Sequence, residues 1–144
     1  MMTTVEQLTQ VFNDNFMAYF RSHVAHVNII GRNFQSDHNL LGGIYEDLQG
    51  QIDTIGELLR TLYEFMPDNL QIVIDNSQIS PMSINGSAID MLTAVYDDIE
   101  HLKSCYQDLI EISGAEGFLE IQNYAQDRVL ALSKHCWMLR ATLD

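Results

Sequence analysis

The sequence has little glycine or proline for its length. Among 144 residues there are 8 Gly and 2 Pro, so long stretches contain neither of the residues that most often interrupt regular structure. This scarcity favours long helices over a strand-rich fold. Hydrophobic residues still make up 47% of the chain, which argues against intrinsic disorder and predicts one domain, residues 1–144, with its own core.

The sequence also lacks features that would place it in or across a membrane. No apolar run approaches the roughly 20 residues that a bilayer crossing needs. Residues 1–10 have neither the basic start nor the apolar centre of a secretory signal peptide, so we expect a cytoplasmic protein. Cys105 and Cys136 lie in no CxxC motif or Cys/His cluster, and we interpret both as reduced, partly buried thiols.

Positive charge is scarce and scattered. Seven Lys and Arg residues face twenty Asp and Glu residues, a formal net charge of −13. Direct DNA binding is therefore disfavoured, because few cationic contacts exist to release counterions from the phosphates. An acidic surface or cavity would instead concentrate small cations. The charge alone also allows an acidic interaction module that mimics nucleic acid.

The first predicted helix covers about residues 4–30. Thr3 and Glu6 have capping-box spacing, and Gly31 interrupts the pattern. Residues at steps of three and four share one face: Val5, Leu8, Phe12, Phe16, Tyr19, His23, His26 and Ile30. A lone histidine on such a face is more often a core residue than a metal ligand. A metal-binding role is favoured only where other potential ligands lie near it.

The second predicted helix starts near Ser36 or Asp37, either of which could cap it, and ends before Pro67. Its core face contains Leu41, Ile44, Leu48, Ile52, Ile55, Leu59 and Leu62. A second stripe, within roughly 100° of arc, contains His38, Gly42, Gln49, Asp53 and Glu57. A solvated surface is the ordinary explanation for such a stripe.

Residues 66–86 form a connector before two further helices. Residues 70–74 could pass for a strand, but no partner strand is visible, and a long structureless segment is unusual, so we expect a short helix there. The remaining helices are predicted over about 87–112 and 116–142. This pattern predicts an all-α, ferritin-like four-helix bundle with a long crossover between its second and third helices. The inward residues are Leu92, Val95, Ile99, Leu102 and Leu109, then Phe118, Ile121, Ala125, Val129, Leu132, Cys136 and Leu139.

Two histidines and two carboxylates could form an iron site, since redox-active iron takes imidazole and oxygen ligands. Asp53 and Glu57 are four residues apart and project from one helix face. His26 and His38 flank the Gly31 break, so an antiparallel hairpin would bring them to similar heights. His38 and Asp53, however, are fifteen residues apart on one helix, or about 22 Å. A second copy packed antiparallel about a two-fold axis would bring one chain's position 38 to the other's position 53.

Three segments carry a resemblance to a known family. Residues 26–38 resemble the pattern H-W-N-x-x-G-x-x-F-x-x-x-H of the Dps mini-ferritins, residues 53–57 resemble its D-x-x-A-E, and residues 134–141 resemble its E-K-x-x-W-M-L-R-A ending. The resemblance implies a dodecameric shell that oxidises ferrous iron, preferentially with hydrogen peroxide, stores the ferric product and limits oxidative damage. It also implies that His26 and His38 come from one chain and Asp53 and Glu57 from its neighbour, with Glu57 towards a second iron position.

The sequence departs from the family pattern at three places. Val27 stands where the family usually has Trp, and Gly42 where many members have Asp. Because a carboxylate is missing at position 42, we expect one tight and one weak iron position, with Glu46 and Gln49 as candidates for partial compensation. The Lys-rich N-terminal arm that many members use on DNA is also missing, so DNA binding should not be transferred.

These departures leave a second interpretation open, namely a cage that stores cations but has lost efficient catalysis. Three further histidines have less specific surroundings in the sequence. His23 is either a neighbour that supports the metal ligands or a core residue. We expect His101 and His135 to be ordinary helix-face residues.

Overall fold

The computed structural model describes residues 2–144 and contains five helices. In chain order they are α1 (Thr4–Asn28), α2 (Phe34–Thr61), α3 (Leu70–Asn76), α4 (Ala88–Ala115) and α5 (Leu119–Leu143). Residues 2–144 contain no strand. The predicted all-α fold with a short helix in the connector is confirmed, and residues 70–74 lie in that helix and not in a strand.

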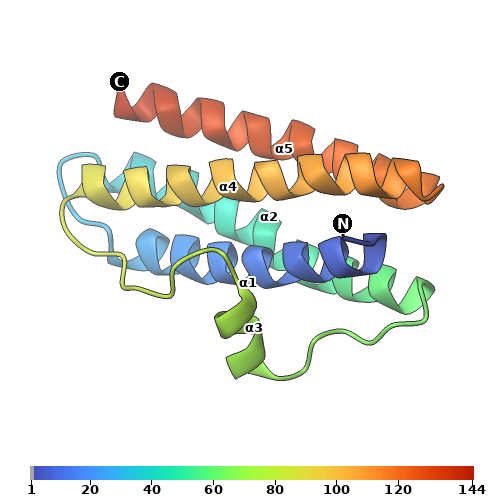
Figure 1. Ribbon diagram of the computed structural model, residues 1–144. Coiled ribbons are helices and arrows are strands. Elements are labelled where there is room, and N and C mark those ends of the chain that lie inside the picture. Colours follow the sequence, from blue (N-terminus) through green and yellow to red (C-terminus); the bar gives the residue numbers. More distant parts are fainter. Residues whose placement is uncertain (1) are drawn as a thin grey trace.

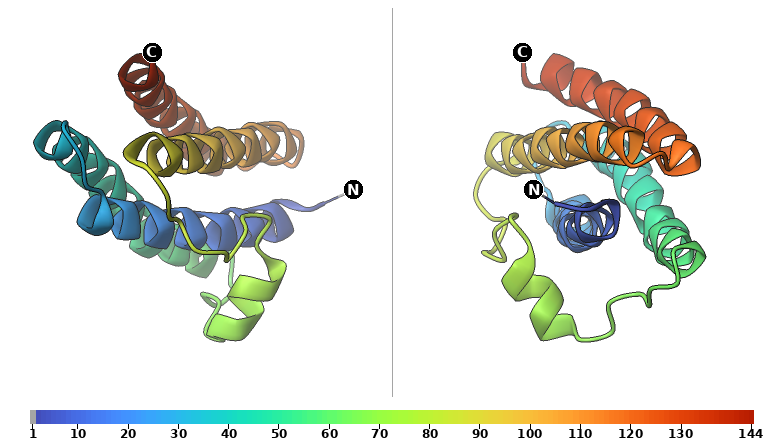
Figure 2. Two further views of the ribbon diagram at one scale, coloured as in Figure 1. Left: turned by 90° about the vertical axis from the view of Figure 1, so that its left-hand side faces the viewer. Right: turned by 45° about the vertical axis from the view of Figure 1, so that its right-hand side comes forward.

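The four long helices form two antiparallel hairpins, and the contact between α1 and α4 joins them (Figure 1). α2 and α4 run in the same direction, so the segment between them must travel back along the bundle. The short α3 lies in this crossover and packs beside α1 (Figure 2). This is the ferritin-like connectivity predicted from the sequence.

Aliphatic side chains at helical spacing form the core. On α2, Leu41, Ile44, Leu48, Ile55 and Leu59 are fully buried, and on α4 the predicted inward residues are buried as well. Both stripes belong to the common hydrophobic core of the bundle, and the burial of this core supplies most of the driving force for folding. Along residues 2–144, no helix combines the length and the hydropathy that a membrane crossing would require.

The turn between α1 and α2 differs from the prediction. α1 ends at Asn28, and the extended Ile29 is fully buried while Ile30 is 76% exposed, so placing Ile30 on the inward face was wrong. Gly31 has a φ of 132°, which favours glycine and turns the chain so that α2 starts at Phe34.

Neither residue proposed as the cap of α2 serves as its N-cap, which is Asn33. Ser36 donates its hydroxyl to the Asn33 carbonyl, and Asp37 is buried in the first turn. By contrast, the predicted cap of α1 is correct: the Thr3 hydroxyl accepts a hydrogen bond from the main-chain N–H of Glu6 at 3.2 Å.

Candidate metal centre

His26 and His38 lie against each other where α1 ends and α2 begins. Their rings are stacked, with centroids 3.8 Å apart and planes 17° from parallel. The Nδ1 of His26 lies 2.7 Å from the carbonyl oxygen of His38, and the Nδ1 of His38 lies 2.7 Å from the carbonyl oxygen of His26. The structure therefore brings together the two histidines that the sequence singled out.

This reciprocal pairing fixes which ring nitrogen is free. A carbonyl oxygen only accepts hydrogen bonds, so each Nδ1 must carry the proton. In the neutral rings both Nε2 atoms then keep their lone pairs, which is the form that binds a metal. Hydrogen bonding of the second ring nitrogen is also the usual way in which proteins orient a metal-ligating histidine.

Aromatic residues surround the pair on the protein side. The Phe34 ring stacks on His38 at 5.0 Å, and the Tyr45 ring lies 4.9 Å from His26. His23 stacks on Tyr45 at 3.9 Å, and its Nδ1 lies 3.0 Å from the Tyr19 hydroxyl. His23 therefore supports the site through Tyr45, by packing.

Gly42 offers no carboxylate ligand, and its backbone lies close to the His26 ring. A Cβ atom at this position would lie 3.0 Å from Cε1 and 3.2 Å from Nδ1 of His26. Those distances are shorter than ordinary carbon contacts, so the imidazole packs directly on the α2 backbone. A side chain at position 42 would therefore require the His26 ring to shift by a few tenths of an ångström.

Asp53 and Glu57 are exposed, and so are Glu46 and Gln49 on the same helix. α2 is continuous from Phe34 to Thr61, which keeps His38 and Asp53 about 22 Å apart in one chain. Within residues 2–144, the group of potential ligands that converges includes none of the four predicted ligands. A single chain thus pairs the histidines but leaves the carboxylates on a distant, open part of α2.

A partly buried ion-pair network across α2 and α5 was not predicted. Arg128 donates two hydrogen bonds of 2.9 Å to the Asp47 carboxylate, and Nε2 of His135 lies 2.8 Å from the same carboxylate. Burial raises the pKa of Asp47, but the hydrogen bonds and positive charge of His135 and Arg128 outweigh it, so the pKa is well below its usual range. The expectation that His135 is an ordinary helix-face residue was wrong, because its partner is 88 residues away in the sequence.

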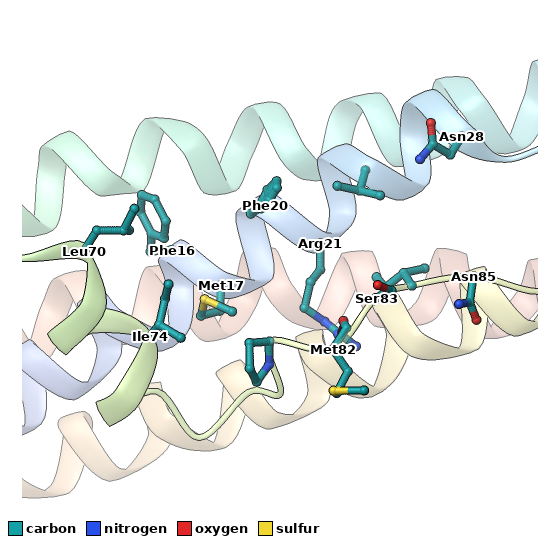
Figure 3. Close-up of a pocket in the computed structure, with 13 residues that line it drawn as sticks. Phe16, Met17, Phe20, Arg21, Asn28, Leu70, Ile74, Met82, Ser83 and Asn85 are labelled. Atoms are coloured by element: carbon teal, nitrogen blue, oxygen red, sulfur yellow. Dashed lines mark hydrogen bonds between the residues drawn. The ribbon is translucent and has the colours of Figure 1, made fainter.

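A groove of about 750 Å³ lies between α1 and the crossover, but it is unsuited to metal binding. Figure 3 shows Phe16, Met17, Leu70 and Ile74 lining one end. Farther along the groove, Arg21 donates to the Met82 carbonyl and is paired with Asp98 at 2.7 Å. No His, Cys, Asp or Glu lines the groove, so the histidine pair remains the better candidate.

Comparison with known proteins agrees with the ferritin-like fold. The family model described as a ferritin-like domain matches residues 5–144. The DNA protection during starvation protein of Helicobacter pylori is 25% identical over 143 residues, covering 99% of both chains. Among solved structures, Helicobacter cinaedi CAIP is 26% identical with a TM-score of 0.91, covering 99% of this chain and 100% of that one. Dps from Staphylococcus aureus is 22% identical with a TM-score of 0.92, covering 98% and 95%, which supports the shared fold.

The match spans both hairpins and the crossover, and the histidine pair lies in the segment that resembles the Dps pattern. The chain belongs to the ferritin-like domain family, and its resemblance to the Dps proteins is confirmed.

Proposed function

We propose that this protein is a ferroxidase and an iron-storing mini-ferritin. The observation that carries the proposal is the histidine pair, whose two Nδ1 atoms are engaged by main-chain carbonyls at 2.7 Å so that both Nε2 atoms are available to Fe²⁺. Imidazole with carboxylate ligands suits redox-active iron. Iron is here the substrate and the stored cargo.

We further propose that a two-fold partner completes the site. His26 and His38 of one chain would meet Asp53 and Glu57 of its neighbour when two α2 helices pack antiparallel. The exposure of Asp53 and Glu57 in the single chain supports this arrangement, because both carboxylates are open to a second copy. One isologous interface of this kind creates two identical sites.

The proposed reaction takes one electron from each of two Fe²⁺ ions and passes both electrons to hydrogen peroxide. With two protons, the peroxide O–O bond breaks and two water molecules form, so no hydroxyl radical is released. The carboxylates of Asp53 and Glu57 stabilise the ferric products by their negative charge. Gly42 offers no ligand, so the second iron position is the weaker one and paired oxidation is slower.

In the proposed assembly, twelve copies of the subunit form a closed cytoplasmic shell. The shell sequesters ferric iron and protects the cell from oxidative damage. A net charge of −13 per chain draws cations towards such a shell. The same charge repels DNA, so the shell acts without direct DNA binding.

The test is peroxide-dependent Fe²⁺ oxidation by purified, assembled protein. The double variant His26→Ala/Asp53→Ala should lose the fast phase while retaining the wild-type particle size. Asp127→Ala, which removes an exposed carboxylate of α5, is the matched control and should retain the rate. A double variant that oxidises iron as fast as the wild type would overturn the assignment.

Gly42 also favours a second candidate, a cage that stores cations without efficient catalysis. The same assay separates the two functions. The storage cage would be supported if the wild-type protein takes up iron but, with peroxide, oxidises Fe²⁺ no faster than protein-free buffer does. A Fe²⁺ titration with two equally tight positions per site would contradict the weak second position.

A further inference from the structure

Three potential metal ligands converge between α1 and α4, away from the histidine pair. They are Asp14 on α1 and His101 and Cys105 on α4, and their ligand atoms all lie within 4.8 Å of one another. Asp14 is fully buried and Cys105 is 3% exposed. The His101 side chain is 32% exposed, so it forms the solvent side of the cluster.

The separations between the ligand atoms fit a tetrahedral metal ion. Oδ2 of Asp14 lies 3.1 Å from Nε2 of His101 and 3.2 Å from Sγ of Cys105, and the Sγ–Nε2 distance is 3.4 Å. Zinc bonds of about 2.0–2.3 Å at the tetrahedral angle put neighbouring ligand atoms about 3.3–3.5 Å apart. A shift of a few tenths of an ångström would therefore admit the ion.

The Asp14 carboxylate is already held in the orientation that a metal would need. Its Oδ1 accepts hydrogen bonds from the Ser77 hydroxyl at 2.9 Å, from the Gln78 main-chain N–H at 2.7 Å and from the Gln10 amide at 3.2 Å. Those contacts leave Oδ2 facing the imidazole and the thiol. Such outer contacts characterise metal-binding carboxylates, because they limit the reorganisation that binding requires.

We propose that Asp14, His101 and Cys105 bind a divalent ion of the zinc class, with a water molecule in the fourth position on the exposed side of His101. Mixed oxygen, nitrogen and sulfur ligands at tetrahedral spacing suit Zn²⁺ or Co²⁺ better than ions that require only oxygen ligands. On binding, the S–H bond of Cys105 breaks, its proton leaves to solvent, and the thiolate sulfur bonds the metal. His101 keeps one proton by moving it from Nε2 to Nδ1.

The sequence contained part of this signal. His101 and Cys105 are four residues apart and lie on one face of α4, so the interpretation that Cys105 lies in no Cys/His cluster was wrong. Asp14 comes from another helix, 87 residues before His101, and only the fold brings it there. Because Asp14 also holds residues 77 and 78, a metal at this site would tie the end of α3 to α1 and α4.

The test uses the reduced, chelator-treated full-length protein titrated with Co²⁺ and then with Zn²⁺. We expect a near-ultraviolet band from thiolate-to-cobalt charge transfer that saturates at one ion per chain and is removed by Zn²⁺. Cys105→Ser keeps a hydroxyl donor to Asp14 and should abolish the band. Cys136→Ser, which alters the other buried thiol, should retain it.

Two further measurements keep the test decisive. His101→Gln should also lose the band if Cys105→Ser fails to fold. His26→Ala/Asp53→Ala should keep it, because the proposed iron site contains no thiol, so the two proposals fail separately. The absence of a charge-transfer band in the wild type, or its persistence in Cys105→Ser, would show that the three residues form only a hydrogen-bond network.

Discussion

His26 and His38 each donate an Nδ1 hydrogen bond to the other's main-chain carbonyl, at 2.7 Å in both directions. The pair therefore locks the end of α1 to the start of α2 and fixes both rings before any metal arrives. Pre-organised ligands lower the conformational cost of binding. Changes that loosen either ring should weaken iron binding without unfolding the bundle.

Gly42→Ala tests this pre-organisation directly. The new methyl group would meet the His26 ring at 3.0 Å, so the ring must shift by a few tenths of an ångström, and we expect this shift to weaken its bond to the His38 carbonyl. Since such a bond contributes about 1 kcal/mol, we expect Fe²⁺ affinity at the tighter position to fall by up to about fivefold. Equilibrium Fe²⁺ titration under anaerobic conditions measures the change.

Gly43→Ala is the matched control, because a Cβ atom there meets nothing within 4 Å. It should leave iron affinity unchanged and stabilise the protein by up to about 1 kcal/mol, since alanine is the better helix former. Equal losses of affinity in the two variants would mean that the contact with His26 is irrelevant. Gly42→Asp should be compared with Gly42→Ala, because only their difference reports the added carboxylate.

Asp47 should make the protein sensitive to acid. Its folded-state pKa is lowered, so its contribution to stability is fully present above the unfolded value of about 3.9 and is lost as the pH falls towards the folded value. Asp47→Asn leaves Arg128 buried without a counter-charge, and we expect it to cost about 3–5 kcal/mol near neutral pH. Thermal unfolding at several pH values measures this cost.

The difference in Tm between wild type and Asp47→Asn should shrink between about pH 5 and pH 2. Asp127→Asn, at an exposed position of α5, should show no comparable difference at any pH. An undiminished difference at the acid end would mean that the Asp47 carboxylate does not titrate as its contacts with Arg128 and His135 require.

Cys136 should be inert towards thiol reagents in the folded protein. The side chain is 1% exposed, and burial raises its pKa to about 12, so at pH 8 only about one thiol in ten thousand is the reactive thiolate. We expect a colorimetric thiol assay on Cys105→Ser to detect no reactive thiol until denaturant is added. Rapid labelling of that variant under native conditions would contradict the packing of α4 on α5.

The repeating local features of the fold were readable from the sequence. Leu41, Ile44 and Leu48 recur at helical spacing, and their full burial follows from that period. The start of α2 was misplaced because Ser36 and Asp37 are good caps by type, whereas the Gly31 turn already directs the chain into the helix at Phe34. The residue types near position 36 do not show that the turn at Gly31 starts the helix earlier, at Phe34.

The candidate site was predictable only where its parts are close in sequence. His26 and His38 flank one turn, so a hairpin had to bring them together. The contacts of Asp47 with Arg128 and of Asp14 with His101 join residues more than 80 positions apart. No local period encodes such pairs, because they depend on how the two hairpins dock.

Mixing two inactive variants tests the shared site most directly. One chain carries His26→Ala/His38→Ala and the other carries Asp53→Ala/Glu57→Ala, and each assembled alone should lack fast peroxide-dependent Fe²⁺ oxidation. In particles co-assembled at equal amounts, about a quarter of the sites would combine intact histidines with intact carboxylates. We therefore predict recovery of about a quarter of the wild-type rate. Mixed particles of verified composition with no recovery would contradict a site divided between two subunits.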